Sequence, residues 1–180
     1  MTRPHYCFCL FMMLAFVALS GCQRENTEEI ESISAPAITI LHHETDSGEG
    51  KKLEQMLEKQ KIGVVYAESV EEIAENSIVF SFFDDELDRE KTTTTLDGHE
   101  TARVLFTVTP DSDYYPLLEQ IAIEIEERYP GIPRGLILSE EQGLSDEVIY
   151  IAVGGPENTA AEKESTIAIL SDYFVHYFAE

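Results

Sequence analysis

Residues 148–153 read VIYIAV, and this run constrains the fold more than any other feature of the chain. All six residues are apolar or aromatic, so neither face of an extended strand at this place could favourably point to water. Strands that are apolar on both sides lie inside sheets whose two faces are covered, as in the parallel sheets of α/β proteins. Gly154, Gly155 and Pro156 follow directly and end the run. The sequence therefore predicts a central strand here.

Other short apolar runs alternate with segments of helical periodicity. Strands are predicted at 37–42, 62–67, 77–83, 134–138 and 148–153, and helices at 48–61, 69–75, 113–129 and 159–178. Such alternation is typical of parallel sheets with helical crossovers. The predicted fold class is α/β, as a three-layer domain with a mostly parallel central sheet.

Turn and capping residues mark several element ends. Asp97-Gly98 predicts a tight turn between hairpin strands at 92–96 and 101–108. Two helix starts have the spacing of a capping box, in which a Ser or Thr and a Glu three residues later satisfy each other's backbone N–H groups. These pairs are Ser69 with Glu72 and Thr159 with Glu162.

The first 22 residues predict export and a lipid anchor. Arg3 precedes the apolar stretch 6–19, which is too short for a membrane span of about 20 residues. Leu-Ser-Gly-Cys at 19–22 matches the lipobox of bacterial lipoproteins, whose cysteine is lipidated and becomes the new N-terminus. A plain secretion signal or an N-terminal anchor is the alternative. The expected organisation is a signal peptide at 1–21, the lipidated Cys22 with an acidic flexible tether at 22–36, and a folded domain at 37–180.

This organisation predicts an extracytoplasmic protein that lipid on Cys22 anchors to the cell membrane. Cys7 and Cys9 would leave with the signal peptide, so no cysteine pair would remain for a disulfide. Thirty-five acidic residues against 12 Lys and Arg give a net charge of −23. That charge excludes nucleic-acid binding and electrostatic adhesion to an anionic membrane, because both need a basic surface.

Five sequence blocks between residues 37 and 178 carry a family resemblance. The two most specific are YPGIPRG at 129–135, which is similar to Y-P-G-L-S-R-G, and the end of block 142–159, which is similar to V-G-G-x-x-N-T. Three others, at 40–47, 79–85 and 91–108, are similar to Y-H-T-H-x-x-E-S, V-[YF]-D-[IL]-H-R-D and K-x-T-T … G … A-R-V-L-F-V-V. Together they resemble the stage II sporulation protein P family, whose members are cell-wall hydrolases related to zinc-dependent N-acetylmuramoyl-L-alanine amidases. The resemblance implies an amidase-like fold.

The same resemblance implies a metal site that this chain keeps only in part. His43 stands at the first metal-ligand position, and Asp46 stands where a Glu ligand is expected. Phe83 occupies the position of the second metal-ligating His, and Phe cannot coordinate zinc. Ala152 occupies the position of the catalytic Glu, and Ala cannot accept a proton. We therefore expect no catalytic residue and no bound cofactor, with His43 and Asp46 as residual metal candidates; a solvated loop is the alternative for these two.

Three functions fit this pattern. The favoured one is non-catalytic: a membrane-anchored lipoprotein with a degenerate amidase domain that binds peptidoglycan, or a cell-wall hydrolase or other partner in wall remodelling. The first alternative is an active zinc amidase that cuts the bond between N-acetylmuramic acid and L-alanine during sporulation. The second alternative is a membrane-tethered scaffold.

Overall fold

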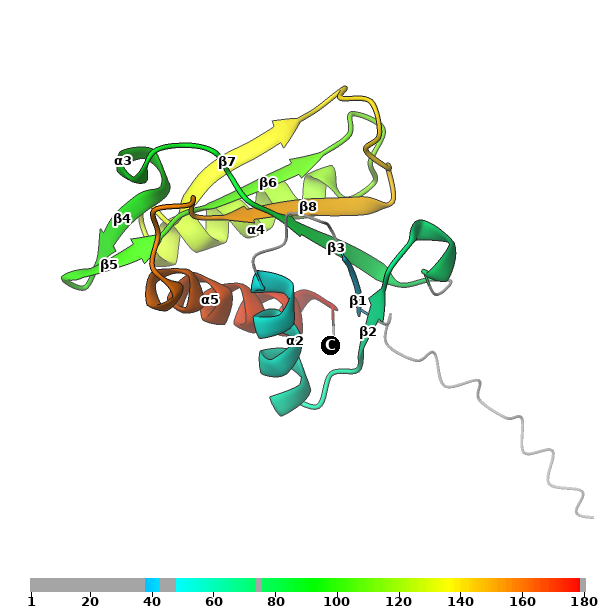
Figure 1. Cartoon of the computed structure of the whole chain (residues 1–180), viewed down its shortest axis with the longest axis horizontal. Helices are drawn as coiled ribbons and strands as arrows, with labels where there is room; N and C mark the ends of the chain where they lie inside the picture. Colours follow the sequence, from blue (N-terminus) through cyan, green and yellow to red (C-terminus); the bar gives the residue numbers. More distant parts are fainter. Residues whose placement is uncertain (1–37, 43–47, 74–75, 179–180) are drawn as a thin grey trace, which may run out of the picture. The chain divides into compact units, whose positions relative to one another are not determined.

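A mixed six-stranded sheet forms the centre of the domain (Figure 1). The structure, a computed structural model, describes residues 38–42, 48–73 and 76–178, all within the compact unit Ser34–Glu180. The strand order is β2-β1-β3-β8-β6-β7. The bounds of these strands are β1 Ile38–Leu41, β2 Val64–Ala67, β3 Ile78–Phe83, β6 Val104–Val108, β7 Pro133–Leu138 and β8 Val148–Val153.

Four of the five strand pairings are parallel, and only β6 runs antiparallel to its neighbour β8. The predicted α/β class with a mostly parallel central sheet is therefore confirmed. Strand β8 lies between β3 and β6, and all six of its residues are buried. As the sequence predicted, β8 is apolar on both sides because both of its faces are buried.

The three long helices share one core with the sheet. They are α2 Glu49–Lys59, α4 Tyr115–Arg128 and α5 Ala160–Phe178, and buried residues from all three join the main hydrophobic cluster. Helix α5 lies beside α2 (Figure 1), where the Gln60 side chain donates to the Ser171 hydroxyl, and it meets α4, where the Tyr173 hydroxyl donates to the Glu124 carbonyl. Phe80 of β3 stacks on Phe174 of α5 with ring centroids 4.4 Å apart.

The opposite face of the sheet carries a smaller cluster. Val79, Val148 and Tyr150 form it, with Ile73 and Leu144 packed against them. The third layer that the sequence predicts consists here of the short 3₁₀ helix η1, Val70–Glu72, and of irregular segments. No long helix covers this face in the described residues, because the connection from β2 to β3 makes only this single turn.

The hairpin forms as predicted at its turn but is shorter than expected. Strands β4, Thr93–Leu96, and β5, His99–Ala102, pair antiparallel, and Asp97 and Gly98 between them have φ values of 50° and 82°. The predicted second strand at 101–108 is instead two strands, divided at Arg103. The Arg103 N–H donates to the Thr92 carbonyl at 2.8 Å, and the chain then enters the main sheet as β6.

One of the two predicted capping boxes is present. Thr159 Oγ1 accepts from the Glu162 N–H, and Glu162 Oε2 accepts from the Thr159 N–H, at 3.3 and 3.1 Å. At η1 the Ser69 side chain makes no capping bond, and the Glu72 carboxylate instead accepts from the Glu68 N–H at 2.9 Å. In this 3₁₀ turn the Glu72 N–H, which the Ser69 hydroxyl would bind in a capping box, donates to the Ser69 carbonyl at 3.1 Å instead.

The predicted signal peptide, Cys22 and the tether at 22–36 lie outside the described residues. Within the part of the chain that is described, no helix is both long and apolar enough to cross a membrane.

Candidate functional site

Phe83 and Ala152 are direct neighbours in the sheet. Phe83 is the last residue of β3, and it pairs with Ala152, the last but one residue of β8. Open α/β sheets bind ligands at the carboxyl ends of their parallel strands, which is where both residues lie. The structure thus brings together the two positions at which the resemblance expects a metal-ligating His and a catalytic Glu.

The other two expected metal positions, His43 and Asp46, lie outside the described residues, as does Cys22. The residue before His43 is exposed His42, whose N–H donates to the Ala67 carbonyl at 2.8 Å. Strand β1 ends just before it and pairs with β3 through Leu41 and Ser81. The chain therefore leaves β1 at the end of the sheet where Phe83 lies, at the carboxyl ends of the parallel strands.

The side chains at Phe83 and Ala152 do not fit a zinc centre. Neither carries a nitrogen, oxygen or sulfur atom, and zinc in proteins is bound by Cys, His, Asp or Glu. Ala152 is enclosed between Phe83 on β3 and Leu105 on β6. Among the described residues, no group of three His, Cys, Asp or Glu side chains is arranged to hold a metal ion.

A lysine ammonium and two carboxylates lie close to the carboxyl end of β3. Lys163 of α5 pairs with Glu49, the first residue of α2, at 2.9 Å and with Asp84 at 3.4 Å. Lys163 and Glu49 are both nearly buried, and Asp84 directly follows Phe83 in the chain. Sequence reasoning did not identify Lys163 or its pairing with Glu49, because the two residues are remote in the chain and no local pattern marks the pair.

A second ion pair, Asp85–Arg134, lies in the same region. The two side chains are only 10% and 12% exposed. A bulge directs the arginine: Val104 pairs with Pro133 and Leu105 pairs with Gly135, which leaves Arg134 as the extra residue of β7. Gly135 has a φ of 140°, a value that residues with a Cβ rarely adopt. Bulges of this kind re-aim a side chain, here toward Asp85.

A cavity of about 450 Å³ opens beside Phe83 on the helix-poor face of the sheet. Phe83 and Tyr150 supply apolar surface, and Thr107, Glu141 and Gln142 supply polar groups. The Tyr150 hydroxyl accepts from the Ser145 N–H at 3.0 Å, which fixes the ring. Aromatic surface with a few fixed polar groups is typical of small-ligand sites.

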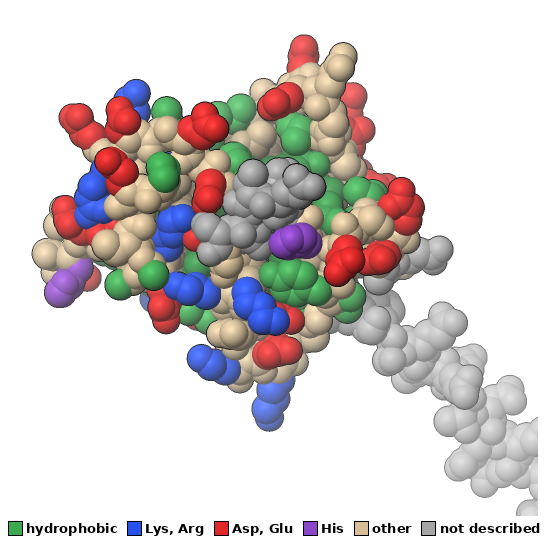
Figure 2. All heavy atoms as spheres, viewed as in Figure 1, with side chains coloured by type: hydrophobic (Ala, Val, Ile, Leu, Met, Phe, Trp, Pro, Cys, Tyr) green, Lys and Arg blue, Asp and Glu red, His purple; other side chains and the backbone are tan. Residues whose placement is uncertain are grey.

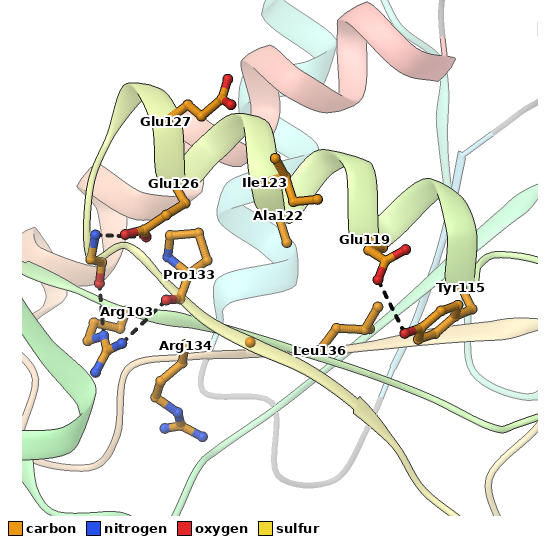
Figure 3. Close-up of a pocket in the computed structure, with 12 residues that line it drawn as sticks. Arg103, Tyr115, Glu119, Ala122, Ile123, Glu126, Glu127, Pro133, Arg134 and Leu136 are labelled. Carbon is orange, nitrogen blue, oxygen red and sulfur yellow. Dashed lines mark hydrogen bonds between the residues drawn. The ribbon is translucent and has the colours of Figure 1, made fainter.

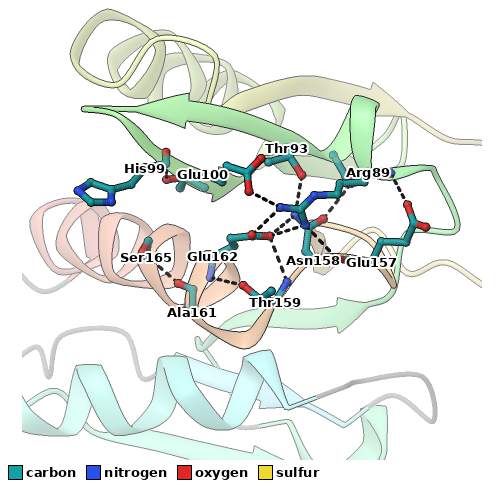
Figure 4. Close-up of polar contacts among 12 residues, drawn as sticks. Arg89, Thr93, His99, Glu100, Glu157, Asn158, Thr159, Ala161, Glu162 and Ser165 are labelled. Carbon is teal, nitrogen blue, oxygen red and sulfur yellow. Dashed lines mark hydrogen bonds and ion pairs between the residues drawn. The ribbon is translucent and has the colours of Figure 1, made fainter.

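Gly155 and Asn158, in the segment VGGPENT at 153–159, organise the start of α5 (Figure 4). Asn158 Oδ1 accepts from the Gly155 N–H and the Thr92 hydroxyl, both at 2.8 Å, and its amide nitrogen donates to Thr93 and Glu162. A Cβ at Gly155 would lie 2.6 Å from the Leu87 carbonyl oxygen. This segment therefore serves a tight turn, and its Gly155 and Thr159 N–H groups bond to side chains of the chain itself.

Arg89 completes this network. Its guanidinium donates to both carboxylate oxygens of Glu162, at 2.6 and 2.9 Å, and to Glu100 at 2.8 Å (Figure 4). The Arg89 hydrogen bonds lower the pKa of Glu162 from 4.5 to about 2, and Asn158 and the Thr159 N–H add to this effect. Glu162 in turn raises the pKa of Arg89. The network ties the segment after β3 to the N-terminus of α5.

A comparison with known protein families agrees with the family resemblance found in the sequence. The family model for stage II sporulation protein P matches residues 68–175, a range that contains Phe83 and Ala152 and begins after His43 and Asp46. No curated protein sequence matches the chain. Among solved structures, N-acetylmuramoyl-L-alanine amidase AmiC2 of Nostoc punctiforme is similar with a TM-score of 0.49 and 12% identity, covering 80% of this chain and 98% of that chain. That likeness is too distant to transfer a residue or an activity.

Proposed function

The chain belongs to the stage II sporulation protein P family, and on this premise we propose that it is a non-catalytic binder of peptidoglycan or of a partner that remodels it. Membership supports a sporulation role connected with the cell wall. The observation that carries the non-catalytic part is the direct pairing of Phe83 with Ala152. At these two positions, where the family has a metal-ligating His and a catalytic Glu, Phe cannot bind a metal and Ala cannot accept a proton.

The size of the expected loss supports this proposal. General acid–base catalysis contributes typically 10²–10⁴-fold to a rate, so the absence of the base would by itself lower the rate of hydrolysis by about that factor. A catalytic zinc needs about three protein ligands, and Phe83 removes one of them. His43 and Asp46 would leave the metal mostly hydrated. The domain is nevertheless held together by ion pairs such as Asp85–Arg134 and Arg89–Glu162.

The cavity beside Phe83 is the proposed binding site. Its aromatic walls suit the apolar faces of sugar rings, and its polar groups suit hydroxyl and amide groups, both of which peptidoglycan presents. The proposed location outside the cytoplasmic membrane would place this cavity where cell-wall polymer is found.

Binding and chemistry are tested together on the purified full chain. We expect retention on isolated wall sacculi, less than one equivalent of zinc after dialysis, and no dye release from labelled sacculi. Phe83→Ala should weaken retention by roughly 10-fold, the effect of losing about 1.4 kcal/mol of aromatic contact. Val65→Ala, on the exposed edge strand β2, is the matched control and should bind as the unmodified chain does.

Each alternative function has its own result in that experiment. One equivalent of zinc with clear dye release would replace the proposal with an active amidase. Absence of both retention and dye release, in a chain that is folded by circular dichroism, would favour the membrane-tethered scaffold.

The lipid anchor on Cys22 is part of the proposal and is tested separately. The unmodified chain should partition into membranes with the mass of a diacylglyceryl-modified protein that begins at Cys22. Cys22→Ala should remain unprocessed or be released. Cys9→Ala, within the predicted signal peptide, is the matched control and should behave as the unmodified chain. Equal mass and partition of Cys22→Ala and the unmodified chain would end the lipoprotein proposal.

A further inference from the structure

Strand β7 forms one edge of the sheet. Its partner is β6, and no described strand pairs with its outer side. An unpaired edge presents a row of backbone N–H and C=O groups that can template another strand. Pro133 and the bulge at Arg134 protect the beginning of β7, but the end of the strand has neither device. Ile137 and Leu138 are 46% and 49% exposed there.

Helix α4 forms a wall along this edge and creates a groove of about 560 Å³ (Figure 3). Leu118, Ile121 and Ile125 turn to the core, whereas Ala122 and Ile123 line the groove. Leu136 of β7 lines it from the sheet side. Ile123 is 55% exposed, the largest exposed fraction among the large hydrophobic side chains described. A groove with apolar side chains from both α4 and β7 therefore runs beside an open strand edge.

The groove is acidic. Glu119, Glu126 and Glu127 of α4 line it. Arg134 lines it too, but its guanidinium pairs with Asp85, and its side chain points away from α4 in Figure 3.

Arg103 supplies a positive charge at one end of the groove. It donates to the carbonyls of Gly131 and Pro133 (Figure 3) and of Lys91. Three carboxylates against this guanidinium leave a net negative lining. A second copy of the chain, with its net charge of −23 and with acidic side chains spread over the face shown in Figure 2, is electrostatically opposed to pairing here.

We propose that β7 and α4 together form a docking site for an extended segment of another protein, one in which pairs of apolar residues alternate with pairs of Lys or Arg, so that both kinds of side chain face α4. The segment adds to β7 as a further strand, so its backbone bonds to the open edge. Its apolar side chains lie against Ile123 and Leu136, and its cations meet Glu119 and Glu127. This surface differs from the cavity beside Phe83, so it does not depend on peptidoglycan binding.

The test uses the full chain in mild detergent and a fluorescent eight-residue peptide in which pairs of valines alternate with pairs of lysines. Binding is measured by anisotropy. We expect saturable binding that Ile137→Lys and Ile123→Lys each weaken at least ~10-fold, since each adds a like charge and removes apolar contact. Val65→Lys is the matched control: Val65 is 44% exposed on β2, the opposite edge strand, and this variant should bind within ~2-fold of the unmodified chain.

Two further peptides separate strand addition from simple charge attraction. The same peptide with alternate backbone nitrogens methylated cannot complete the strand ladder and should bind at least ~10-fold more weakly. A peptide in which glutamate replaces every lysine should not bind. Equal binding of the methylated peptide, or equal loss in Val65→Lys and Ile137→Lys, would overturn the proposal. So would a concentration-dependent dimer of the unmodified chain that Ile137→Lys dissociates, because the occupant would then be a second copy.

Discussion

Asp85 and Arg134 form a nearly buried ion pair although 49 residues separate them in the chain. Asp85 follows β3, and Arg134 is the bulged residue near the start of β7, so the pair links strands that are not neighbours in the sheet. Asp85 also accepts from the Leu87 N–H at 3.0 Å, which holds the segment after β3. The pair thus stabilises the edge of the sheet where Phe83 and Ala152 meet.

Arg134→Met should lower the free energy of unfolding by about 3 kcal/mol, because it leaves the Asp85 carboxylate nearly buried without a cation. The double variant Asp85→Asn with Arg134→Met should recover at least ~1 kcal/mol of that loss, since no unpaired charge remains. Urea unfolding followed by circular dichroism measures both. A double variant that is no more stable than Arg134→Met would contradict the ion-pair explanation.

Stability should fall in acid through Glu162. Its pKa is about 2 in the folded chain against an ordinary 4.5. Between these pH values the unfolded chain takes up a proton that the folded chain does not, so stability declines as pH drops from 4.5 toward 2. Glu162→Gln should show a flatter dependence of unfolding free energy on pH in that window. Glu164→Gln, an exposed glutamate on the same helix, should follow the unmodified chain.

Gly155→Ala should destabilise the fold by roughly 1–3 kcal/mol, the usual effect of overpacking. The added Cβ would lie 2.6 Å from the Leu87 carbonyl oxygen, and backbone must move to admit it. Gly63→Ala is the control, because a Cβ there meets nothing within 4 Å. That variant should match or slightly exceed the unmodified chain in thermal melting temperature. Equal melting temperatures for both variants would rule out a steric requirement at Gly155.

Phe83 and Ala152 should show energetic coupling when the residues expected from the family are restored. Ala152→Glu places a carboxylate between Phe83 and Leu105 and should cost about 3 kcal/mol. Adding Phe83→His supplies a neighbouring imidazole, so the double variant should be at least ~1 kcal/mol more stable than the sum of the single changes. Phe83→His should also increase zinc retained after dialysis, through His43 and Asp46.

The control for this cycle is Ala161→Glu, on the exposed side of α5, which should change stability by no more than ~0.5 kcal/mol. Strict additivity of Phe83→His and Ala152→Glu in urea unfolding would mean that the two side chains do not face each other. Hydrolysis by Phe83→His alone would contradict the need for a base at position 152.

Features that depend on a few consecutive residues were predictable. The turn at Asp97-Gly98 and the capping box of Thr159 and Glu162 are local, because their hydrogen bonds join residues at most three positions apart. The alignment of blocks predicted that Phe83 and Ala152 replace a metal-ligating His and a catalytic Glu, and this stays a prediction. The second capping box, at Ser69, was predicted by the same rule and did not form, since the helix there is only one 3₁₀ turn.

The ion pairs of the candidate site could not be predicted. Lys163 meets Glu49 and Asp84 only because α5 and α2 begin at the same edge at which β3 ends. No spacing in the chain encodes such a meeting. The division of the expected strand 101–108 at Arg103 could not be predicted for the same reason. The place at which the chain passes from the hairpin into the main sheet depends on contacts between distant segments.

By itself, then, the sequence determined the central position of β8 and the alternation of strands and helices. These follow from composition and from hydrogen bonds between near neighbours. Tertiary structure alone decided that β6 runs antiparallel to β8, that Phe83 pairs directly with Ala152, and that β7 is left as an open edge. The physical reason is that strand order and direction depend on contacts between distant segments, whose free energies appear only when the chain has folded.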